Sequence, residues 1–546
     1  MAKRISRRRF LKYAGIGSAG ALVTLAGCAA PPVAPAPTAA PAALAATAVP
    51  APTSAPVPTA VPTTAAPKIL RIRLYSDIVN IDPAFRASNN DETVMDAIFS
   101  KLVTYGPNSY ELKNDLAEKI ETSEDGKTIT FKIREGVMWP KGYGELTTED
   151  VKYSFERIAD PATKAAYKDD WAALDHVEVI DKYNGKIILK EPFAALWKTT
   201  LPIGSGAIVS KKWVEEVGVE KFGTNVIGTG PYYLADWQQK QKIVLKRNPV
   251  YYGEPPAYDE IHFYPMEDDK TSEVALEAGE IDFGRVSTSS IQRYESGGNV
   301  KLVRKPSLRY RWIGMNVENP KLKDINVRQA IRYALDVPGI VKATYMGQAD
   351  VEYGLIPPGT LGYWADAPHY ERDVAKAKEY MKKAGIETLD LRIDIQDTSE
   401  YRSWAEIAQQ NLKEIGINLT INPMDSSAFW ALGAGEKGKE AELFSNNYSM
   451  QPDPSWATMW FTCEQVGVWN WERWCNKEYD DLHAKGLVTL DDKARNEIYI
   501  KMQQIADADA KAIFITHGEM DYGYLPTVQP ATTPHGLMQP IYFKPA

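Results

Sequence analysis

The segment CEQVGVWNWERWC, from Cys463 to Cys475, concentrates the residue types that could do chemistry in this chain of 546 residues. Two thiolates supply only half of a tetrahedral metal site, and no histidine lies between them. The three tryptophans between the cysteines, Trp469, Trp471 and Trp474, could instead contact a ligand or a membrane. The segment by itself therefore allows a metal clamp, a membrane wedge or part of a ligand site.

The other residue types that carry catalysis lack a supporting spacing. The six histidines are scattered, so the HExxH pattern of zinc enzymes is absent. The stretch GAGEKGKE at 433–440 imitates a phosphate loop, but Glu440 stands where Ser or Thr would ligate magnesium, and a surface loop is expected. GSG at 204–206 lacks the spacing of a nucleophile elbow. Carboxylates are abundant, so a secreted glycoside hydrolase stays an alternative. We predict no enzyme, no cofactor and no metal.

The N-terminus has the pattern of an export signal. SRRRFLK at 6–12 contains a twin-arginine pair, and the apolar and small residues that follow are too few to span a bilayer comfortably. LAGC at 25–28 resembles the lipobox of bacterial lipoproteins. We therefore expect a signal peptide over 1–27 and a lipid on Cys28, which would place the protein on the outer face of the cytoplasmic membrane or in the periplasm. The alternative is a transmembrane helix with an ordinary cysteine.

The next segment differs in composition from the rest of the chain. Residues 29–67 are almost entirely Ala, Pro, Thr and Val and carry no charge, which predicts a disordered tether from the lipidated Cys28 to residue 67. Residues 1–27 hold six of the 63 basic side chains and no acid, so the remainder has 57 bases against 71 acids, a formal net charge of -14. A chain this acidic does not attract phosphate backbones, so nucleic acid is excluded as a partner.

Local patterns beyond the tether predict an α/β protein, and its length predicts two or more lobes. KTITFKIREGVMW at 127–139 alternates as a strand does, with Ile129, Phe131 and Ile133 on one face. VRQAIRYALD places Val327, Ile331 and Leu335 on one helical stripe, which we expect in the core.

The stretch from Asp373 to Ile421 predicts a crossover unit. A helix capped by Asp373 is followed by a strand over 389–395, a helix near 403–415 and a strand over 417–421. Strand, helix and strand in this order predict a parallel pair in a mainly parallel sheet. The loop 396–401 follows the carboxyl end of the first strand, where ligands bind in such sheets; a solvated turn with a helix cap is the alternative.

Several motifs in a fixed order resemble the family 5 extracellular solute-binding proteins of ABC transporters, the group that includes the oligopeptide- and dipeptide-binding proteins. The resemblance extends from about Ile69 to the C-terminus. The motifs are LAEKIETSEDGKTITFKIREGVMW at 116–139, LTTEDVKYSFER at 146–157, GTGPYYL at 228–234, ALEAGEIDF at 275–283 and MNVENPKLKDINVRQAIRYALD at 315–336.

The resemblance implies a two-lobed periplasmic-binding-protein fold, the type II Venus flytrap of peptide-binding members, with mixed sheets and a ligand cleft between the lobes. Lobe one would combine 68–308 with 513–546, and lobe two would be 309–512. The implied function is a monomeric substrate-binding lipoprotein of an ABC importer that delivers peptides or peptide-like solutes to the permease subunits in the membrane. A binding protein for oligosaccharides or another organic solute in the same fold stays an alternative.

One position departs from the peptide-binding pattern. Those members hold the ligand's ammonium group with an aspartate a few residues before an acid-proline step, and alignment on Asp453 and Pro454 places Met450 there. Methionine cannot pair with an ammonium, and an unpaired buried cation is costly. Either Asp397, at a strand end, supplies the carboxylate, or the ligand has no free amine.

The resemblance also assigns the site residues. Asn447, Tyr448 and Met450 carry over from the ligand strand of lobe two, and Ser88 and Asn89 align with the cleft segment of lobe one, with a helix cap as the rival role. Asp453 is expected to shape its own turn. The ligand-binding candidates are Ser88, Asn89, Asp397, Asn447, Tyr448, Met450, Trp469 and Trp471.

Export also bears on the two cysteines. An exported protein meets oxidising conditions, so Cys463 and Cys475 are expected to form a disulfide. Closing a loop of about 13 residues contributes roughly 3 kcal/mol in the chain-entropy model. Glu464, Glu472 and Arg473 interrupt the apolar surface and disfavour the membrane wedge. The segment is thus predicted to be an aromatic loop beside the cleft, with Trp469 and Trp471 facing either ligand or core.

Overall fold

The computed structural model describes residues 66–433 and 435–546. The predicted signal peptide, the lipidation site Cys28 and the tether up to residue 65 lie outside the described residues.

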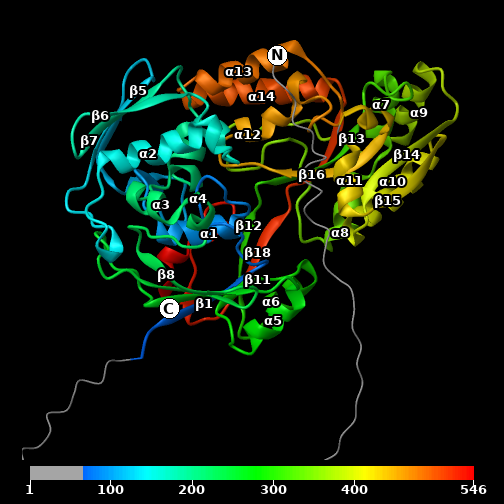
Figure 1. Cartoon of the computed structure of the whole chain (residues 1–546). Coiled ribbons are helices and arrows are strands. Elements are labelled where there is room, and N and C mark those ends of the chain that lie inside the picture. Colours follow the sequence, from blue (N-terminus) through cyan, green and yellow to red (C-terminus); the bar gives the residue numbers. More distant parts are fainter. Residues whose placement is uncertain (1–65, 434) are drawn as a thin grey trace, which may run out of the picture. The chain divides into compact units, whose positions relative to one another are not determined.

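A seven-stranded mixed sheet forms one half of the described body (Figure 1). Its order is β12-β18-β11-β1-β10-β9-β8; β1 runs parallel to β10 and β11, and the other neighbours are antiparallel. The buried residues of β1 contribute to the largest apolar core. The strands are β1 (Ile69–Leu74), β8 (Tyr232–Gln238), β9 (Lys242–Arg247), β10 (Glu260–Pro265), β11 (Phe283–Arg285), β12 (Lys301–Pro306) and β18 (Glu519–Tyr524).

A four-stranded antiparallel sheet, in the order β4-β5-β7-β6, packs on the same core. Its β5 (Thr128–Ile133) confirms the alternating pattern, because Ile129, Phe131 and Ile133 are all buried. The other strands are β4 (Ala117–Thr122), β6 (Leu174–Val179) and β7 (Asn184–Leu189), and two hairpins pair β2 (Val103–Tyr105) with β3 (Leu112–Asn114) and β19 (Val528–Gln529) with β20 (Lys544–Pro545).

A five-stranded mixed sheet in the order β15-β14-β16-β13-β17 forms the other half. β14 (Leu389–Gln396) runs parallel to β15 (Ile417–Met424), and the helix between them packs on β15, so the predicted crossover unit is confirmed. β16 (Leu443–Ser449) lies between β14 and β13 (Arg309–Met315), and β17 (Ala512–Thr516) closes the edge.

The helices mostly begin at side-chain caps that the sequence supplies. The helix of the crossover unit starts four residues earlier than expected, because Thr398 caps it, which is the rival role proposed for loop 396–401. The predicted core stripe of Val327, Ile331 and Leu335 is buried along and just after α7. The helices are α1 (Asn89–Ile98), α2 (Thr148–Ala159), α3 (Lys211–Val217), α4 (Val219–Phe222), α5 (Asp269–Glu277), α6 (Ile291–Glu295), α7 (Ile325–Ala334), α8 (Val337–Tyr345), α9 (Val374–Lys383), α10 (Ser399–Lys413), α11 (Ser426–Leu432), α12 (Ser455–Thr458), α13 (Lys477–Val488) and α14 (Asp492–Ala508).

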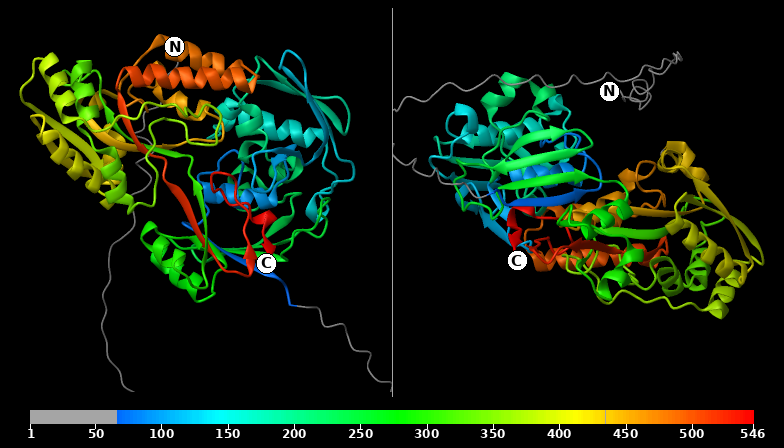
Figure 2. Two further views of the ribbon diagram at one scale, coloured as in Figure 1. Left: turned by 180° about the vertical axis from the view of Figure 1, so that it is seen from behind. Right: turned by 90° about the horizontal axis from the view of Figure 1, so that it is seen from below.

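The chain crosses between the two large sheets twice, once from β12 to β13 and once from β17 to β18 (Figure 2). The crossings are bonded together: the N–H of Ser307 donates to the carbonyl of Gly518 at 3.1 Å, and its hydroxyl donates to the carbonyl of His517 at 2.5 Å. Gly518 has φ +67°, and a Cβ there would lie 2.4 Å from the guanidinium of Arg311, so only glycine fits. β17 pairs with β13, so the second crossing falls at residues 517 and 518.

Candidate functional site

The strand β16 has one incomplete edge. It pairs with β13 along its whole length, but on its other side β14 reaches only Leu443 and Phe444. The N–H of Met450 donates to the carbonyl of Leu308 at 2.9 Å, so in the antiparallel alternation the backbone groups of Asn447 and Ser449 point away from β13. The N–H of Asn447 donates to Oδ1 of Asn446 at 2.8 Å. The carbonyl of Asn447 and the backbone groups of Ser449 face the open edge, where another extended chain could pair with them.

One face of β16 is covered by an aromatic wall made of Trp430, Tyr448, Trp456, Trp460 and Trp469. The ring of Tyr448 lies 6.2 Å from Trp430, 6.2 Å from Trp460 and 6.0 Å from Trp469 between centroids. The four indoles are each partly exposed. Rings at these separations pack against one another, so the wall presents indole surface to solvent. Such a surface suits apolar side chains or the C–H faces of sugars.

The opposite face of β16 is polar. The amide of Asn447 donates to the hydroxyl of Tyr401 at 2.5 Å, and Arg311 lies 3.1 Å from the carboxylate of Glu400. The hydroxyl of Tyr345 also donates to Glu400. Burial raises the pKa of Tyr401 to about 12, so its hydroxyl stays neutral at physiological pH.

Met450 is 4% exposed and belongs to the buried cluster of Tyr310, Trp312 and Tyr448. The carboxylate that was predicted to replace the missing aspartate, that of Asp397, is engaged. Asp397 is half exposed and accepts from Arg402 at 2.6 Å, which lowers its pKa.

Asp453 is fully buried and shapes the turn after β16, as expected. Its Oδ1 accepts from the N–H and hydroxyl of Ser455, and from Nη2 of Arg495 at 2.9 Å. Nη1 of Arg495 lies 2.9 Å from Oδ2, as an ion pair rather than an aligned hydrogen bond. This ion pair connects the turn to α14 and thereby holds the end of β16 in place.

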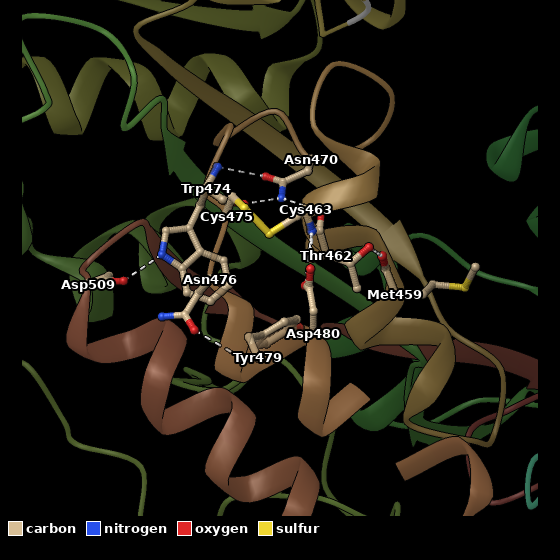
Figure 3. The surroundings of a disulfide bond; sticks show 10 residues. All are labelled: Met459, Thr462, Cys463, Asn470, Trp474, Cys475, Asn476, Tyr479, Asp480 and Asp509. Carbon is tan, nitrogen blue, oxygen red and sulfur yellow. Dashed lines mark hydrogen bonds between the residues drawn. A yellow bond between two sulfur atoms is a disulfide. The ribbon is translucent and has the colours of Figure 1, made fainter. Parts of the chain in front are cut away.

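The disulfide loop supplies Trp469 to the aromatic wall. In the structure the sulfurs of Cys463 and Cys475 lie 2.09 Å apart (Figure 3). The Asn470 amide donates to the carbonyls of Thr462 and Trp474, and the N–H of Cys463 donates to Asp480 at 3.1 Å.

The two tryptophans of the loop that were predicted to contact ligand have different surroundings. The carbonyl of Trp469 accepts from the hydroxyl of Tyr448 at 2.6 Å, and its ring is partly exposed. Trp471 is 2% exposed and packs on Phe429 and Phe444. Trp469 therefore has an exposed surface that can contact a ligand, whereas Trp471 lies in a core.

Two buried ionisable groups, Glu472 and Lys511, lie behind the wall. Glu472 accepts from the indole N–H of Trp312 at 2.6 Å, and burial raises its pKa. Lys511 is 2% exposed, its Nζ lies 3.6 Å from the ring centroid of Phe461, and burial lowers its pKa to about 8. Neither group reaches the exposed surface of the wall, because Glu472 is 0% exposed and Lys511 is 2% exposed.

The residues predicted from the other half of the chain lie at the start of α1. Ser88 caps this helix in a reciprocal capping box with Asp91, and Asn89 is exposed. One turn later, Glu92 lines a cavity of about 50 Å³ that also touches Gln451, next to Met450. Burial raises the pKa of Glu92, against the opposing charge of Arg86. Glu92 of α1 and Gln451, which lies two residues after the end of β16, thus line the same small cavity.

The structure brings Asn447, Tyr448, Met450 and Trp469 together. Sequence reasoning missed Trp430, Trp456 and Trp460. A signal was present for the last two, because PSWATMW places Trp456 and Trp460 four residues apart, on one helix face. Trp430 gave no such signal, since it reaches the wall from a different helix, α11.

Two further findings concern metals and membranes. Within residues 66–433 and 435–546, no three His, Cys, Asp or Glu side chains lie close enough to hold a metal ion. In the part of the chain that the structure describes, no helix is both long and apolar enough to cross a membrane.

The chain is similar in sequence and in structure to known proteins. The glutathione-binding protein GsiB of Escherichia coli O6:K15:H31 is 29% identical over 451 residues, which cover 81% of this chain and 87% of that protein. The dipeptide-binding protein of Escherichia coli K12 is 28% identical over 447 residues, covering 77% of this chain and 83% of that protein.

The structural comparisons confirm the predicted fold class. HbpA2 from Haemophilus parasuis superposes with a TM-score of 0.79 at 23% identity, covering 88% of this chain and all of that one. The ABC transporter substrate-binding protein CtaP of Listeria monocytogenes gives 0.79 at 26% identity, covering 87% of this chain and 99% of that one. The model of bacterial extracellular solute-binding proteins, family 5, matches residues 111–469. This chain therefore belongs to family 5 of the bacterial extracellular solute-binding proteins.

Proposed function

We propose that this chain is the substrate-binding lipoprotein of an ABC importer, and that it captures peptides or peptide-like solutes in a cleft between two lobes and delivers them to a membrane permease. The open edge of β16 carries this proposal, because the backbone of a peptide can add there as an extra strand. The names of the relatives, glutathione-binding and dipeptide-binding protein, support the same solute class.

The lobes would be 68–308 with the C-terminal return, and the segment between them. The pairing of β12 with β18 and of β13 with β17 supports this division, with the second crossing at 517–518 rather than 513. Two crossings bonded to each other form a short hinge, on which one lobe can close over a solute. A solute that binds the closed form better than the open form stabilises it, and the permease would recognise that form.

Export and anchoring belong to the proposal as well. The twin-arginine signal would export the chain, the lipid on Cys28 would hold it at the outer face of the cytoplasmic membrane, and the protein would act as a monomer. The Cys463–Cys475 bond would form after export. The mass of the N-terminal peptide of the mature protein tests the lipid.

We assign the solute to the open edge at Asn447, to Tyr448 and Trp469 of the wall, and to Ser88 and Asn89 across the cavity. Met450 would bound the site as an apolar surface. Asp397 and Trp471 are weaker candidates for contact with the solute, because Asp397 is paired with Arg402 and Trp471 is enclosed by Phe429 and Phe444.

Titration calorimetry with dipeptides, tripeptides, glutathione, cello-oligosaccharides and xylo-oligosaccharides tests the solute class. Binding of peptides and no sugars supports the proposal. Binding of sugars and no peptides would establish the second candidate, an oligosaccharide-binding protein, which the exposed indole surface favours. Release of sugar monomers from the same oligosaccharides would point to a hydrolase.

Acetylating the amine of a bound peptide is expected to change its affinity by less than about threefold. Met450 offers no carboxylate, and both Asp397 and Asp453 are already paired with arginines. Neither aspartate is therefore free to bind the ammonium group, so acetylation removes no ion pair with them. Calorimetry of each peptide with and without the acetyl group measures this. A loss of 100-fold or more on acetylation, roughly 2.8 kcal/mol, would show that a carboxylate binds the amine after all.

Trp469→Ala is expected to weaken solute binding on the order of 10- to 100-fold, because partly exposed indoles at binding sites contribute strongly. Trp237→Ala is the matched control: this indole is also partly exposed, but it lies on β8 and bonds Asp77. Calorimetry of both variants with the same peptide gives the comparison. Equal affinities in the two variants would remove Trp469 from the site.

A further inference from the structure

The loop that joins α13 to α14, residues 487–492, contacts a segment from a distant part of the chain. The N–H of Ala194 donates to the carbonyl of Leu487 at 2.9 Å. Nζ of Lys198 lies 3.0 Å from both carboxylate oxygens of Asp492, which follows it by 294 residues. In the proposed division of the chain, these two bonds join lobe one to lobe two at a place other than the hinge.

An apolar contact accompanies the two bonds. Leu490, in the middle of the loop, packs against the turn between β4 and β5: a Cβ on Gly126 would lie 2.5 Å from Cδ1 of Leu490 and 3.2 Å from the side chain of Pro192. Figure 1 shows one end of α13 and α14 beside the four-stranded sheet to which this turn belongs. Leu490 nevertheless stays 43% exposed, so the contact removes only part of its apolar surface from water.

Within lobe two, the loop is connected to the end of β16 through one guanidinium group. Nε of Arg495 donates to the carbonyl of Gly486, directly before the loop, at 3.0 Å. Nη2 of the same side chain donates to Asp453, which shapes the turn after β16. A displacement of that turn is therefore transmitted to the loop through buried hydrogen bonds.

Within lobe one, the partner segment is connected to the candidate site as well. Lys198 lies in a π-helical turn, Leu196–Thr200, a rare conformation that is frequent at functional sites. Its carbonyl accepts from the hydroxyl of Tyr105 at 2.5 Å. Tyr105 lines the cavity of about 50 Å³ that Gln451 of lobe two also lines. Both sides of the loop contact are thus bonded to residues next to the site.

The contact consists of interactions that are individually weak. The side chains of Lys198 and Asp492 are 29% and 62% exposed, and ion pairs this accessible to water contribute little. A single backbone hydrogen bond also contributes modestly, because water replaces it when it breaks. By contrast, the bonds that Ser307 makes at the hinge are buried. The loop contact can therefore break while the hinge stays intact.

We propose that the α13–α14 loop is a latch, which holds the two lobes together over a bound solute and opens to release it. The inference deepens the proposed function and rests on its division into two lobes. A solute that fixes the end of β16 would hold the loop in place through Arg495, ready for Ala194 and Lys198. Closure of the latch would in return strengthen solute binding, because coupling between two sites is reciprocal.

Hydrogen exchange of the Ala194 amide, measured by mass spectrometry on the full-length protein, reports how often the latch opens. Without solute, Lys198→Met is expected to accelerate this exchange about 2- to 5-fold, and Leu490→Ala about 3- to 10-fold. The double variant should reach on the order of 10-fold or more. The amide of Ser307, which bonds Gly518 at the hinge, should exchange at the wild-type rate in all three variants.

Lys186→Met is the matched control. Lys186 has a similar exposure and lies 3.3 Å from Glu178, but both residues belong to the four-stranded sheet, so this pair joins no lobes. Exchange at Ala194 should not change in this variant. An unchanged rate at Ala194 in the double variant, or an equal acceleration in Lys186→Met, would overturn the latch.

Peptide binding tests whether the latch is coupled to the solute. A mixture of synthetic dipeptides and tripeptides is expected to slow exchange at Ala194 at least 10-fold in wild type. Calorimetry should show that the double variant of Lys198→Met and Leu490→Ala loses affinity by about the factor by which its exchange accelerates, because destabilising the closed form lowers the apparent affinity equally. A contact that only frays would accelerate exchange and leave affinity unchanged, and that result would overturn the proposal.

Failure of the proposed solute class gives a separate result. Peptides that bind by calorimetry without slowing exchange at Ala194 would overturn the latch and leave the proposed function standing. If no peptide binds, the solute class fails, and the latch is judged by the solute-free comparison of the double variant with Lys186→Met. Faster exchange at Ala194 in the double variant alone would then support it.

Discussion

Arg495→Met is expected to lower the free energy of unfolding by about 3–5 kcal/mol, because it leaves the carboxylate of Asp453 buried without its counter-charge. Asp453 is 0% exposed and Arg495 is 0% exposed, so water cannot replace the guanidinium. Burial alone would raise the pKa of Asp453, but Arg495 and the bonds from Ser455 hold it below its usual value. The contribution is therefore present above about pH 4, the unfolded pKa of an aspartate, and is lost as the pH falls through the lower folded value.

Urea unfolding followed by tryptophan fluorescence measures this change, and a matched control separates burial from charge. Lys477 and Asp481 form an ion pair at 2.7 Å with both side chains exposed, so Lys477→Ala is expected to cost less than about 1 kcal/mol. The double variant Asp453→Asn with Arg495→Met is expected to recover part of the lost free energy of unfolding, because a neutral amide at position 453 leaves no buried charge without a partner. Equal effects of Arg495→Met and Lys477→Ala would show that the buried pair does not stabilise the fold.

The same substitution is expected to weaken solute binding. Asp453 follows the ligand strand by four residues, and its bonds to Arg495 and Ser455 fix the turn that ends that strand. Arg495 lies behind the turn and acts as a positioning residue. Peptide affinity should therefore fall in Arg495→Met under conditions where circular dichroism shows the protein still folded, and stay unchanged in Lys477→Ala.

Replacing Cys463 and Cys475 together by alanine is expected to lower the free energy of unfolding by roughly 3 kcal/mol, the chain-entropy value for a loop of this length. The loop has other internal bonds, since Asn470 joins its two arms and Asp480 holds the N–H of Cys463 (Figure 3). We therefore expect the variant to fold, with a less restricted Trp469. Its peptide affinity should fall by about the same factor as in Trp469→Ala, or less.

Wild type treated with a reductant is the control for the cysteine variant, because both lack the covalent closure. Their urea midpoints should agree, and both should lie below the midpoint of untreated wild type. Free thiols on Cys463 and Cys475 in the protein isolated after export, or a reductant without effect on wild type, would contradict the stabilising bond.

Local patterns in the sequence predicted much of the fold. Alternation placed Ile129, Phe131 and Ile133 in one core, and a strand-helix-strand order predicted the parallel pair of β14 and β15. Helix starts were predicted less well, because Thr398 caps α10 inside a loop that was also a candidate for ligand contact. A capping residue and a ligand residue can be the same types, and only the N–H groups that approach the side chain decide which role it has.

The candidate site was predictable in part. The family resemblance named Asn447, Tyr448 and Met450, which lie on or directly after β16. The aromatic loop itself offered Trp469 and Trp471 alike as candidates for ligand contact, since nothing in CEQVGVWNWERWC distinguishes them. Folding separates them: Trp471 fills the space beside Gly433, where a Cβ would lie 1.9 Å from its indole, while Trp469 turns to Tyr448.

What the sequence determined by itself is the class of protein and one constraint on its solute. The ordered motifs place the chain in its family, and Met450 predicts a site that lacks the expected carboxylate for a free amine. Tertiary structure decided the rest of the candidate site: the open edge of β16 and the wall that Trp430 and Trp460 complete. Periodicity reports which face of one element is apolar, but these features join separate elements or arise where a neighbouring strand ends, and only the packed fold brings them together.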